Sequence, residues 1–211
     1  QTNSPEECHY VLSHSDSRAV FVEDAEQLAK IRAVEGDCPE LRATIVLEDD
    51  WDAFLDAGGR VGDGELAERE ATLQFDDPIN IQYTSGTTGF QKGATLSHHN
   101  VLNNGYFVGE FCGYTEQDRI CIPVPFHHCF GMVMGSLATT THGACMVIPA
   151  PGFDPALTLT AVAEERCTSL YGVPTMFIAE WALPDLDSYD LSSVRTGIMA
   201  GSPCPASMMT K

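Results

Sequence analysis

Apolar and polar positions along the chain follow two alternating patterns. Residues 18–23, "RAVFVE", form a short apolar run typical of a buried strand, and residues 24–34, "DAEQLAKIRAV", have the spacing of an amphipathic helix. The same alternation recurs to the end of the chain. Further strands are predicted over 42–48, 78–84, 119–124, 144–149, 167–173 and 194–201, and further helices over 4–15, 98–109, 131–142, 154–166 and 174–183.

Helix-start signals support this division. Ser4 and Asp154 are suited to cap helices, each with a Pro at the next position, and Ser97 is suited to cap the helix that begins at residue 98. Residues 49–77 are charged and rich in glycine, which predicts a surface segment with one or two short helices. Repeated alternation of strand and helix predicts an α/β fold with a largely parallel sheet covered by helices.

Composition narrows the possible partners. The chain has 211 residues, with 30 acidic against 11 basic side chains and a formal charge of −19. Such a charge disfavours nucleic acid and anionic membrane surfaces, which are bound through clustered Lys and Arg. Runs of apolar residues fall short of the roughly 20 needed to span a bilayer. The balance predicts a soluble protein with a solvated acidic surface.

The cysteines indicate the redox environment of the protein, and the two ends of the chain indicate whether it is part of a longer protein. Eight cysteines are present, without a CxxC pair, and several lie in apolar runs, such as Cys121 in "ICIPV" and Cys145 in "ACMVI". Cysteines of this kind behave as small hydrophobic residues, and we expect them to be reduced, in the cytoplasm. The chain begins with Gln1 and ends at Lys211, and we expect it to be a segment of a longer protein.

The stretch "YTSGTTGFQKGATLSHHN", residues 83–100, carries the clearest candidate chemistry. It follows a predicted strand, at the place where ligands collect in doubly wound folds. Its glycines allow a close backbone approach, its hydroxyls are hydrogen-bond donors, and Lys92 adds a compact positive charge. Together they predict a cradle for a polyphosphate. From composition alone, a plain turn between the strand and the helix is as well supported as a phosphate site. The stretch also lacks the spacing of the common phosphate loop, GxxxxGK followed by Ser or Thr.

The same stretch resembles the phosphate signature of the adenylate-forming enzymes, a superfamily of acyl- and aryl-CoA synthetases, peptide-synthetase adenylation domains and luciferases. The family pattern is Tyr/Phe-Thr-Ser-Gly-Thr-Thr-Gly-x-Pro-Lys-Gly, and this chain departs from it only at Gln91, where Pro is usual. Proline would stiffen the loop before the lysine. The residues that the resemblance assigns to the ATP phosphates are Thr84, Ser85, Gly86, Thr87, Thr88, Gly89 and Lys92.

Three further stretches agree with the resemblance. "VPFHHCFGMVMG" resembles a segment beside the acyl pocket, which assigns His128 to the family's histidine and replaces the preceding aromatic residue by His127. By residue type alone, these two histidines with Cys129 also suggest a metal site, but the ligand spacing and a second cluster are missing. The remaining pocket and adenine residues implied by the resemblance are Gly172 and Val173 in "LYGVPTMF", and Gly201, Ser202 and Pro203 in "MAGSPCP".

The resemblance is greatest to bacterial and mitochondrial synthetases of medium- and long-chain fatty acids. It implies that residues 1–211 are a fragment of the N-terminal AMP-binding domain, without the rest of that domain or the C-terminal domain. It also implies that the parent enzyme uses ATP with magnesium (Mg²⁺) to convert a fatty acid to acyl-AMP, and then CoA to form acyl-CoA. Lys92 and His128 would be the catalytic residues, and the fragment alone would be inactive.

Two alternatives remain open at this point. An aryl-CoA ligase, or an adenylation domain for another carboxylate, would use the same chemistry on a different acid. A non-catalytic nucleotide-binding module would keep the loop without the reaction, and the departures at Gln91 and His127 are the features that favour it.

Overall fold

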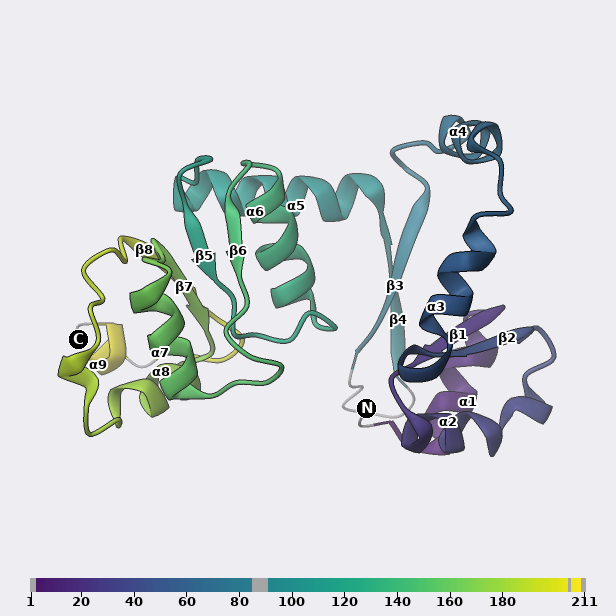
Figure 1. Cartoon of the computed structure of the whole chain (residues 1–211), viewed down its shortest axis with the longest axis horizontal. Coiled ribbons are helices and arrows are strands. Elements are labelled where there is room, and N and C mark those ends of the chain that lie inside the picture. The colour runs from purple at the N-terminus through teal and green to yellow at the C-terminus, as the bar shows by residue number, and fades with distance from the viewer. Residues whose placement is uncertain (1–2, 85–90, 205, 210–211) are drawn as a thin grey trace. The chain divides into compact units, whose positions relative to one another are not determined.

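The computed structural model of the chain describes residues 3–84, 91–204 and 206–209. The chain divides into two compact units, Gln1–Leu96 and Ser97–Lys211 (Figure 1). The alternation of strands and helices predicted from the sequence is confirmed, but the division into two units was not predicted from it.

The first unit begins with a parallel pair of strands and two helices packed on them. Its elements up to residue 71 are α1 (Pro5–His14), β1 (Ala19–Val22), α2 (Ala25–Arg32), η1 (Glu35–Asp37), β2 (Ala43–Val46), α3 (Leu47–Gly58) and α4 (Asp63–Ala71). Strands β1 and β2 are parallel, with Val22 opposite Val46. A small core of Leu12, Val22, Ile31, Cys38 and Val46 joins these strands to α1 and α2. The helices predicted within residues 49–77 are confirmed as α3 and α4.

Helix α1 starts where the sequence predicts. Ser4 accepts a hydrogen bond from the amide of Glu7, and the Glu7 carboxylate accepts one from the amide of Ser4, which forms a complete capping box. Pro5 occupies the first turn, where its missing N–H costs no hydrogen bond. These features fix the residue at which the helix begins.

A second pair of strands closes the first unit. β3 (Pro78–Thr84) was predicted, whereas β4 (Lys92–Ser97), which pairs with it, was not. The sequence of β4, "KGATLS", contains only one large apolar residue, Leu96, so it has no alternating pattern to detect. The pairing corrects the placement of Lys92. It is the first residue of a strand rather than part of an open loop.

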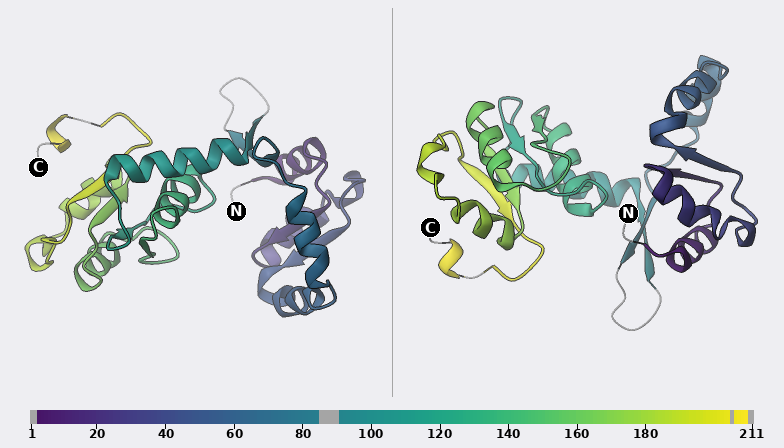
Figure 2. Two further views of the ribbon diagram at one scale, coloured as in Figure 1. Left: turned by 90° about the horizontal axis from the view of Figure 1, so that it is seen from above. Right: turned by 60° about the horizontal axis from the view of Figure 1, so that its bottom comes forward.

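The second unit is a four-stranded parallel sheet with helices on both faces (Figures 1 and 2). Its elements are α5 (His98–Cys112), β5 (Arg119–Cys121), η2 (Phe130–Leu137), α6 (Ala138–Thr140), β6 (Cys145–Val147), α7 (Pro155–Glu164), β7 (Ser169–Gly172), α8 (Pro174–Trp181), η3 (Leu186–Ser188), β8 (Thr196–Met199) and α9 (Ala206–Met209). The strand order is β6-β5-β7-β8, and each neighbouring pair is parallel. This confirms the predicted parallel sheet.

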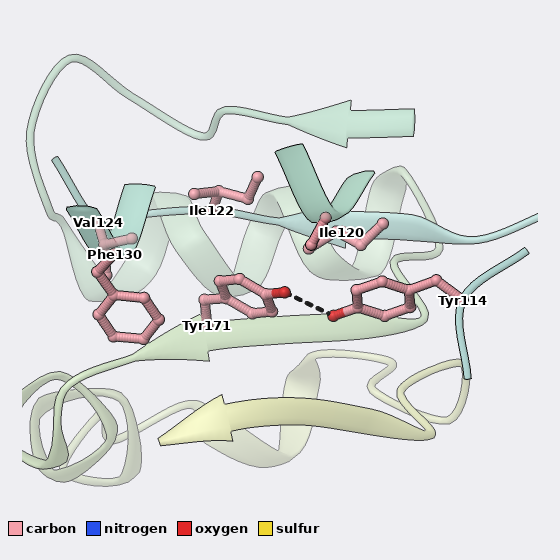
Figure 3. Close-up of a cluster of buried hydrophobic side chains, with 7 residues drawn as sticks. Tyr114, Ile120, Ile122, Val124, Phe130 and Tyr171 are labelled. Carbon is pink, nitrogen blue, oxygen red and sulfur yellow. Dashed lines mark hydrogen bonds between the residues drawn. The ribbon is translucent and has the colours of Figure 1, made fainter. Parts of the chain in front are cut away.

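Side chains of the central strands alternate between the two faces of the sheet, as a period of two requires. Ile120 and Ile122 pack with Tyr171 on the face covered by α5 and η2 (Figure 3). Cys121 and Leu170 point to the opposite face, where α7 and α8 cover them. The apolar setting expected for Cys121 is confirmed.

The edge of the sheet is different. Cys145 belongs to β6, one of the two outer strands of the described sheet, and its side chain is exposed. Cys145 lies in a strand at its apolar run, as predicted, but its side chain is not buried as that of Cys121 is.

The amino ends of three strands are joined through one carboxylate. Asp118 is 3% exposed and directly precedes β5. Its oxygens accept hydrogen bonds from Thr168 Oγ1 at 2.6 Å, and from Arg195 Nη2 at 2.7 Å and Nε at 3.1 Å. Burial by itself would raise the pKa of Asp118, but the hydrogen bonds from Arg195 and Thr168 outweigh it and hold that pKa below its ordinary value.

Candidate functional site

The candidate site in the second unit lies at the carboxyl ends of its parallel strands. The chain leaves β5 toward β6 on one side, and β7 and β8 lie on the other side of β5. The order of connections therefore reverses between β5 and β7, and in open α/β sheets ligands bind at the carboxyl ends of the strands beside such a reversal. The segments that follow β5, β7 and β8 contain His127 and His128, Val173, and Gly201 to Pro203 respectively.

The loop after β5 exposes both predicted histidines. His127 and His128 are exposed, whereas Phe130, two residues later, is 4% exposed and anchors the loop in the core. The amide of Phe130 donates a hydrogen bond to His128 Nδ1 at 3.1 Å. In the neutral imidazole the proton must then be on Nε2, because Nδ1 is acting as an acceptor. His128 thus presents an N–H donor away from its own backbone.

The segment that follows these histidines is a π-helix, η2, which is a rare element often found at functional sites. Its Met134 carbonyl accepts a hydrogen bond from the hydroxyl of Tyr171 at 3.1 Å. That hydroxyl in turn accepts one from Tyr114 at 3.0 Å, drawn as the dashed line in Figure 3. Burial raises the pKa of both tyrosines, which keeps their hydroxyls protonated as donors. The helix was predicted from the sequence, but its π geometry and the role of Tyr171 were not.

Gly172, which the resemblance assigns to the acyl pocket, ends β7 and is buried. A Cβ at this position would lie 2.9 Å from Cε2 of Phe177, so the aromatic ring of α8 already fills the space. The missing side chain permits α8 to pack closely against β7, and the assignment of Gly172 to the acyl pocket stays a prediction.

Val173 and Gly201 are brought together at the same edge. The amide of Ala200 donates to the carbonyl of Gly172 at 3.2 Å, which extends the pairing of β7 and β8 by one residue. Gly201 follows with φ of +89°, a conformation that side chains rarely tolerate, and its Cβ would lie 3.1 Å from Cγ1 of Val173. Ser202 and Pro203 are exposed beside it. The turn after β8 is therefore held against the segment after β7.

The predicted phosphate residues belong to the first unit. Thr84 ends β3 and Lys92 begins β4, and both are exposed. The Thr84 hydroxyl donates to the Lys92 carbonyl at 3.4 Å, which links the two strand ends. The remaining residues predicted for this role, Ser85, Gly86, Thr87, Thr88 and Gly89, lie outside the described residues.

The structure thus brings the predicted residues together in two groups. Thr84 and Lys92 stand side by side at the strand ends of the first unit. The histidines, Val173 and the turn at Gly201 lie at the carboxyl edge of the sheet in the second unit. A groove in the second unit is lined by β6 and α7, including Met146, Ile148 and Leu157, and none of the predicted residues lines it.

Two further observations concern metals and membranes. Within the part of the chain that the structure describes, no group of three or more His, Cys, Asp or Glu residues is arranged to hold a metal ion. None of the described helices has the length and apolar character needed to cross a bilayer.

The chain is similar in sequence to a family of known enzymes and to individual members of known function. The sequence model of the family described as AMP-binding enzymes matches residues 1–211. The medium-chain acyl-CoA ligase ACSF2, mitochondrial, of the zebrafish Danio rerio is 46% identical over 181 residues, covering 82% of this chain and 30% of the ligase. The acyl-CoA ligase sidI of Aspergillus fumigatus is 39% identical over 226 residues, covering 100% of this chain and 38% of that protein.

A solved structure gives the same result for the fold. ATP-bound MatB from Rhodopseudomonas palustris superposes with a TM-score of 0.76 at 25% identity, covering 98% of this chain and 40% of MatB. The chain therefore has the fold of part of such an enzyme. It spans about a third of the length of the two curated relatives.

Proposed function

The chain belongs to the AMP-binding enzyme family, and we propose that the whole protein is an ATP-dependent fatty-acid–CoA ligase. The observation that carries this proposal is the identity of 46% with a medium-chain acyl-CoA ligase over 82% of the chain. The sidI relative is also named as an acyl-CoA ligase, which supports an acid–thiol ligase as the reaction class.

The proposed reaction has two steps. In the first, a carboxylate oxygen of the fatty acid attacks the α-phosphorus of ATP, the bond between the α- and β-phosphates breaks, and pyrophosphate leaves. In the second, the sulfur of CoA attacks the acyl carbonyl, the bond to AMP breaks, and acyl-CoA and AMP are released. Catalysis of the first step consists mainly of positioning and charge neutralisation.

We propose that Lys92 and Thr84 serve the phosphates, together with Ser85, Thr87, Thr88 and the intervening glycines. Lys92 is exposed at the start of β4, in a chain with few basic residues, so its charge is available to a polyanionic ligand. Its role is to offset the charge of the departing pyrophosphate. We propose that Mg²⁺ arrives with ATP, because Mg²⁺ is commonly held by substrate phosphates.

We propose that His128 orients the substrate carboxylate. Its Nε2–H is directed away from the Phe130 amide that occupies Nδ1, so the ring can donate one hydrogen bond to a carboxylate or phosphate oxygen. Val173 and His127 are proposed to contribute to the wall of the acyl pocket. Gly201, Ser202 and Pro203 are proposed to lie along the adenine ring, where the positive φ of Gly201 shapes the turn.

We also propose that the protein is located in the cytoplasm. All eight cysteines are free, which supports a reducing environment such as the cytoplasm.

The test is pyrophosphate release by the whole protein, with ATP and Mg²⁺, against fatty acids from four to eighteen carbons. Benzoate and several amino acids serve as controls. We expect release that depends on one band of chain lengths, followed by acyl-CoA formation when CoA is added. Release with benzoate or an amino acid alone would assign a different acid. Folded protein that binds ATP but releases no pyrophosphate would be a nucleotide-binding module, and the ligase proposal would fail.

A further inference from the structure

Helix α1 contacts both strands that flank the phosphate residues. Tyr10 and His14 are four residues apart, and therefore lie on one face of this helix, with their rings stacked at 5.2 Å between centroids. His14 Nδ1 lies 2.8 Å from the hydroxyl of Tyr83, the last residue but one of β3. The Tyr10 hydroxyl donates to the carbonyl of Gln91, immediately before β4, at 2.9 Å. One face of one helix therefore holds the end of β3 and the start of β4.

Ring contacts add to these hydrogen bonds. The Tyr83 ring meets Tyr10 edge-on at 6.2 Å and His14 edge-on at 5.8 Å between centroids. Such edge-to-face pairs are favourable arrangements of aromatic rings. The three side chains thus form a small cluster, and the Tyr10 hydroxyl extends from it to the Gln91 backbone. The capping box fixes the residue at which α1 begins, and Tyr10 and His14 of the cluster both belong to this helix.

The bond from Tyr10 acts one residue before the proposed phosphate lysine. Lys92 follows Gln91 directly, so the orientation of the Gln91 peptide group determines the direction in which Lys92 leaves the backbone. Position 91 holds Gln, whose φ is free, whereas Pro at this position would restrict φ by its ring. The hydrogen bond from Tyr10 holds the carbonyl of Gln91, and so restricts the backbone of the same residue at its other rotatable bond.

We propose that Tyr10 is a positioning residue for Lys92, fixing the Gln91 peptide so that the lysine is presented to the ATP phosphates. This inference rests on the proposed function, since it assigns Lys92 to ATP. Tyr10 itself does not contact the reacting atoms in this assignment. His14 supports it by holding Tyr83 in the same cluster.

The variant that tests the proposal is Tyr10→Phe in the whole protein, which removes the hydroxyl and keeps the ring. Loss of one hydrogen bond of this kind changes an equilibrium by roughly threefold to tenfold. We expect kcat/KM for ATP to fall by about that factor, with the KM for the fatty acid and the melting temperature nearly unchanged. A matched control is Tyr189→Phe, because no hydrogen bond of the Tyr189 hydroxyl occurs among the described residues. A fall in melting temperature with no change in kcat/KM for ATP would instead indicate a merely structural role and overturn the proposal.

A second variant tests the mechanism directly. Gln91→Pro restricts the backbone of the same residue through the proline ring, so in the Tyr10→Phe background it should return kcat/KM for ATP to within about twofold of wild type. If the double variant stays as weak as Tyr10→Phe, the assignment to the Gln91 peptide is wrong.

Hydrogen exchange separates this proposal from the ligase proposal. Without nucleotide, the amides at the start of β4 should exchange about threefold or more faster in Tyr10→Phe than in Tyr189→Phe, as expected when one hydrogen bond is lost. Unchanged exchange would overturn the positioning role even in a protein that activates no fatty acid. If the wild type releases no pyrophosphate but exchange is faster in Tyr10→Phe, the ligase proposal is refuted. The role of the Tyr10 hydrogen bond in positioning Lys92 is then still supported.

Discussion

The two ends of the parallel strands in the second unit use polar side chains in opposite ways. At the amino ends, the Asp118 carboxylate is buried and saturated with donors from the residues that precede β7 and β8. At the carboxyl ends, His127, His128 and the turn at Gly201 are exposed. A buried charge is tolerated only when it is fully paired, whereas a binding group must keep a free donor or acceptor. The comparison indicates that one end holds the strands together and the other is available to a ligand.

The Arg195 side chain strengthens the amino end further. Its Nη2 donates to the carbonyl of Gly113 at 2.7 Å, just beyond the last turn of α5. A guanidinium in this position satisfies a carbonyl that the helix leaves unpaired and lies favourably at the negative end of the helix dipole. One arginine therefore links Asp118, the start of β8 and the end of α5.

The largest expected effect comes from Asp118→Asn, which keeps the shape of the side chain and removes its charge. It should lower the free energy of unfolding of the sheet by about 3 kcal/mol, because the charge-assisted bonds to Arg195 are lost within a buried site. Hydrogen exchange of the β5 and β7 amides in the whole protein measures this change. Asp187→Asn, at an exposed position, is the control. An effect no larger than that of the control would mean that the network is dispensable.

The same variant has a defined pH dependence. Because the pKa of Asp118 is lower in the folded state than in the unfolded state, its stabilisation is present above the unfolded value of about 3.9 and is lost as pH falls through the folded pKa. The difference between wild type and Asp118→Asn should therefore shrink below about pH 4.

The next effect concerns the other end of the sheet. His128→Ala should reduce kcat/KM for the fatty acid by roughly 10- to 100-fold, equivalent to about 1.4 to 2.7 kcal/mol, through loss of an orienting donor. Because the side chain is exposed, the melting temperature should barely change. Steady-state pyrophosphate release measures the loss, with His127→Ala as the neighbouring comparison. Equal activity in wild type and His128→Ala would remove this histidine from the site.

The smallest effect is expected from Gly201→Ala. The residue has φ of +89° and little space beside Val173, so alanine should shift the turn and raise the KM for ATP by about fivefold, or roughly 1 kcal/mol. Gly152→Ala is a matched control, since a Cβ there meets nothing within 4 Å. The contrast between the two ends would weaken if both alanine variants bound ATP equally well.

The sequence predicts the elements better than their connections. The apolar runs of β5 and β7 and the caps at Ser4 and Asp154 are local signals, and each was confirmed. β4 was missed because its side chains lack a strand pattern and the strand depends on pairing with β3.

The contacts around the candidate site were less predictable. Tyr10 is separated from Gln91 by 81 positions, and Asp118 from Arg195 by 77, and no local pattern indicates either pair. Gly172 was assigned to the acyl pocket by the resemblance, and only the tertiary structure shows that the Phe177 ring packs beside it. Motifs identify the residue types of a site, and its supporting contacts come from the tertiary structure.

The Asp118 network also bears on the order of folding during synthesis. Thr168 follows Asp118 by 50 positions and Arg195 follows it by 77, so the ribosome completes the set of partners only after most of the second unit has been made. At ordinary elongation rates, roughly 4 to 15 seconds separate the carboxylate from its arginine. Until then Asp118 is more stable when its carboxylate is hydrated, because burial of β5 would also bury the unpaired charge of Asp118. The sheet is therefore expected to form late and in one step, when β8 emerges to complete it.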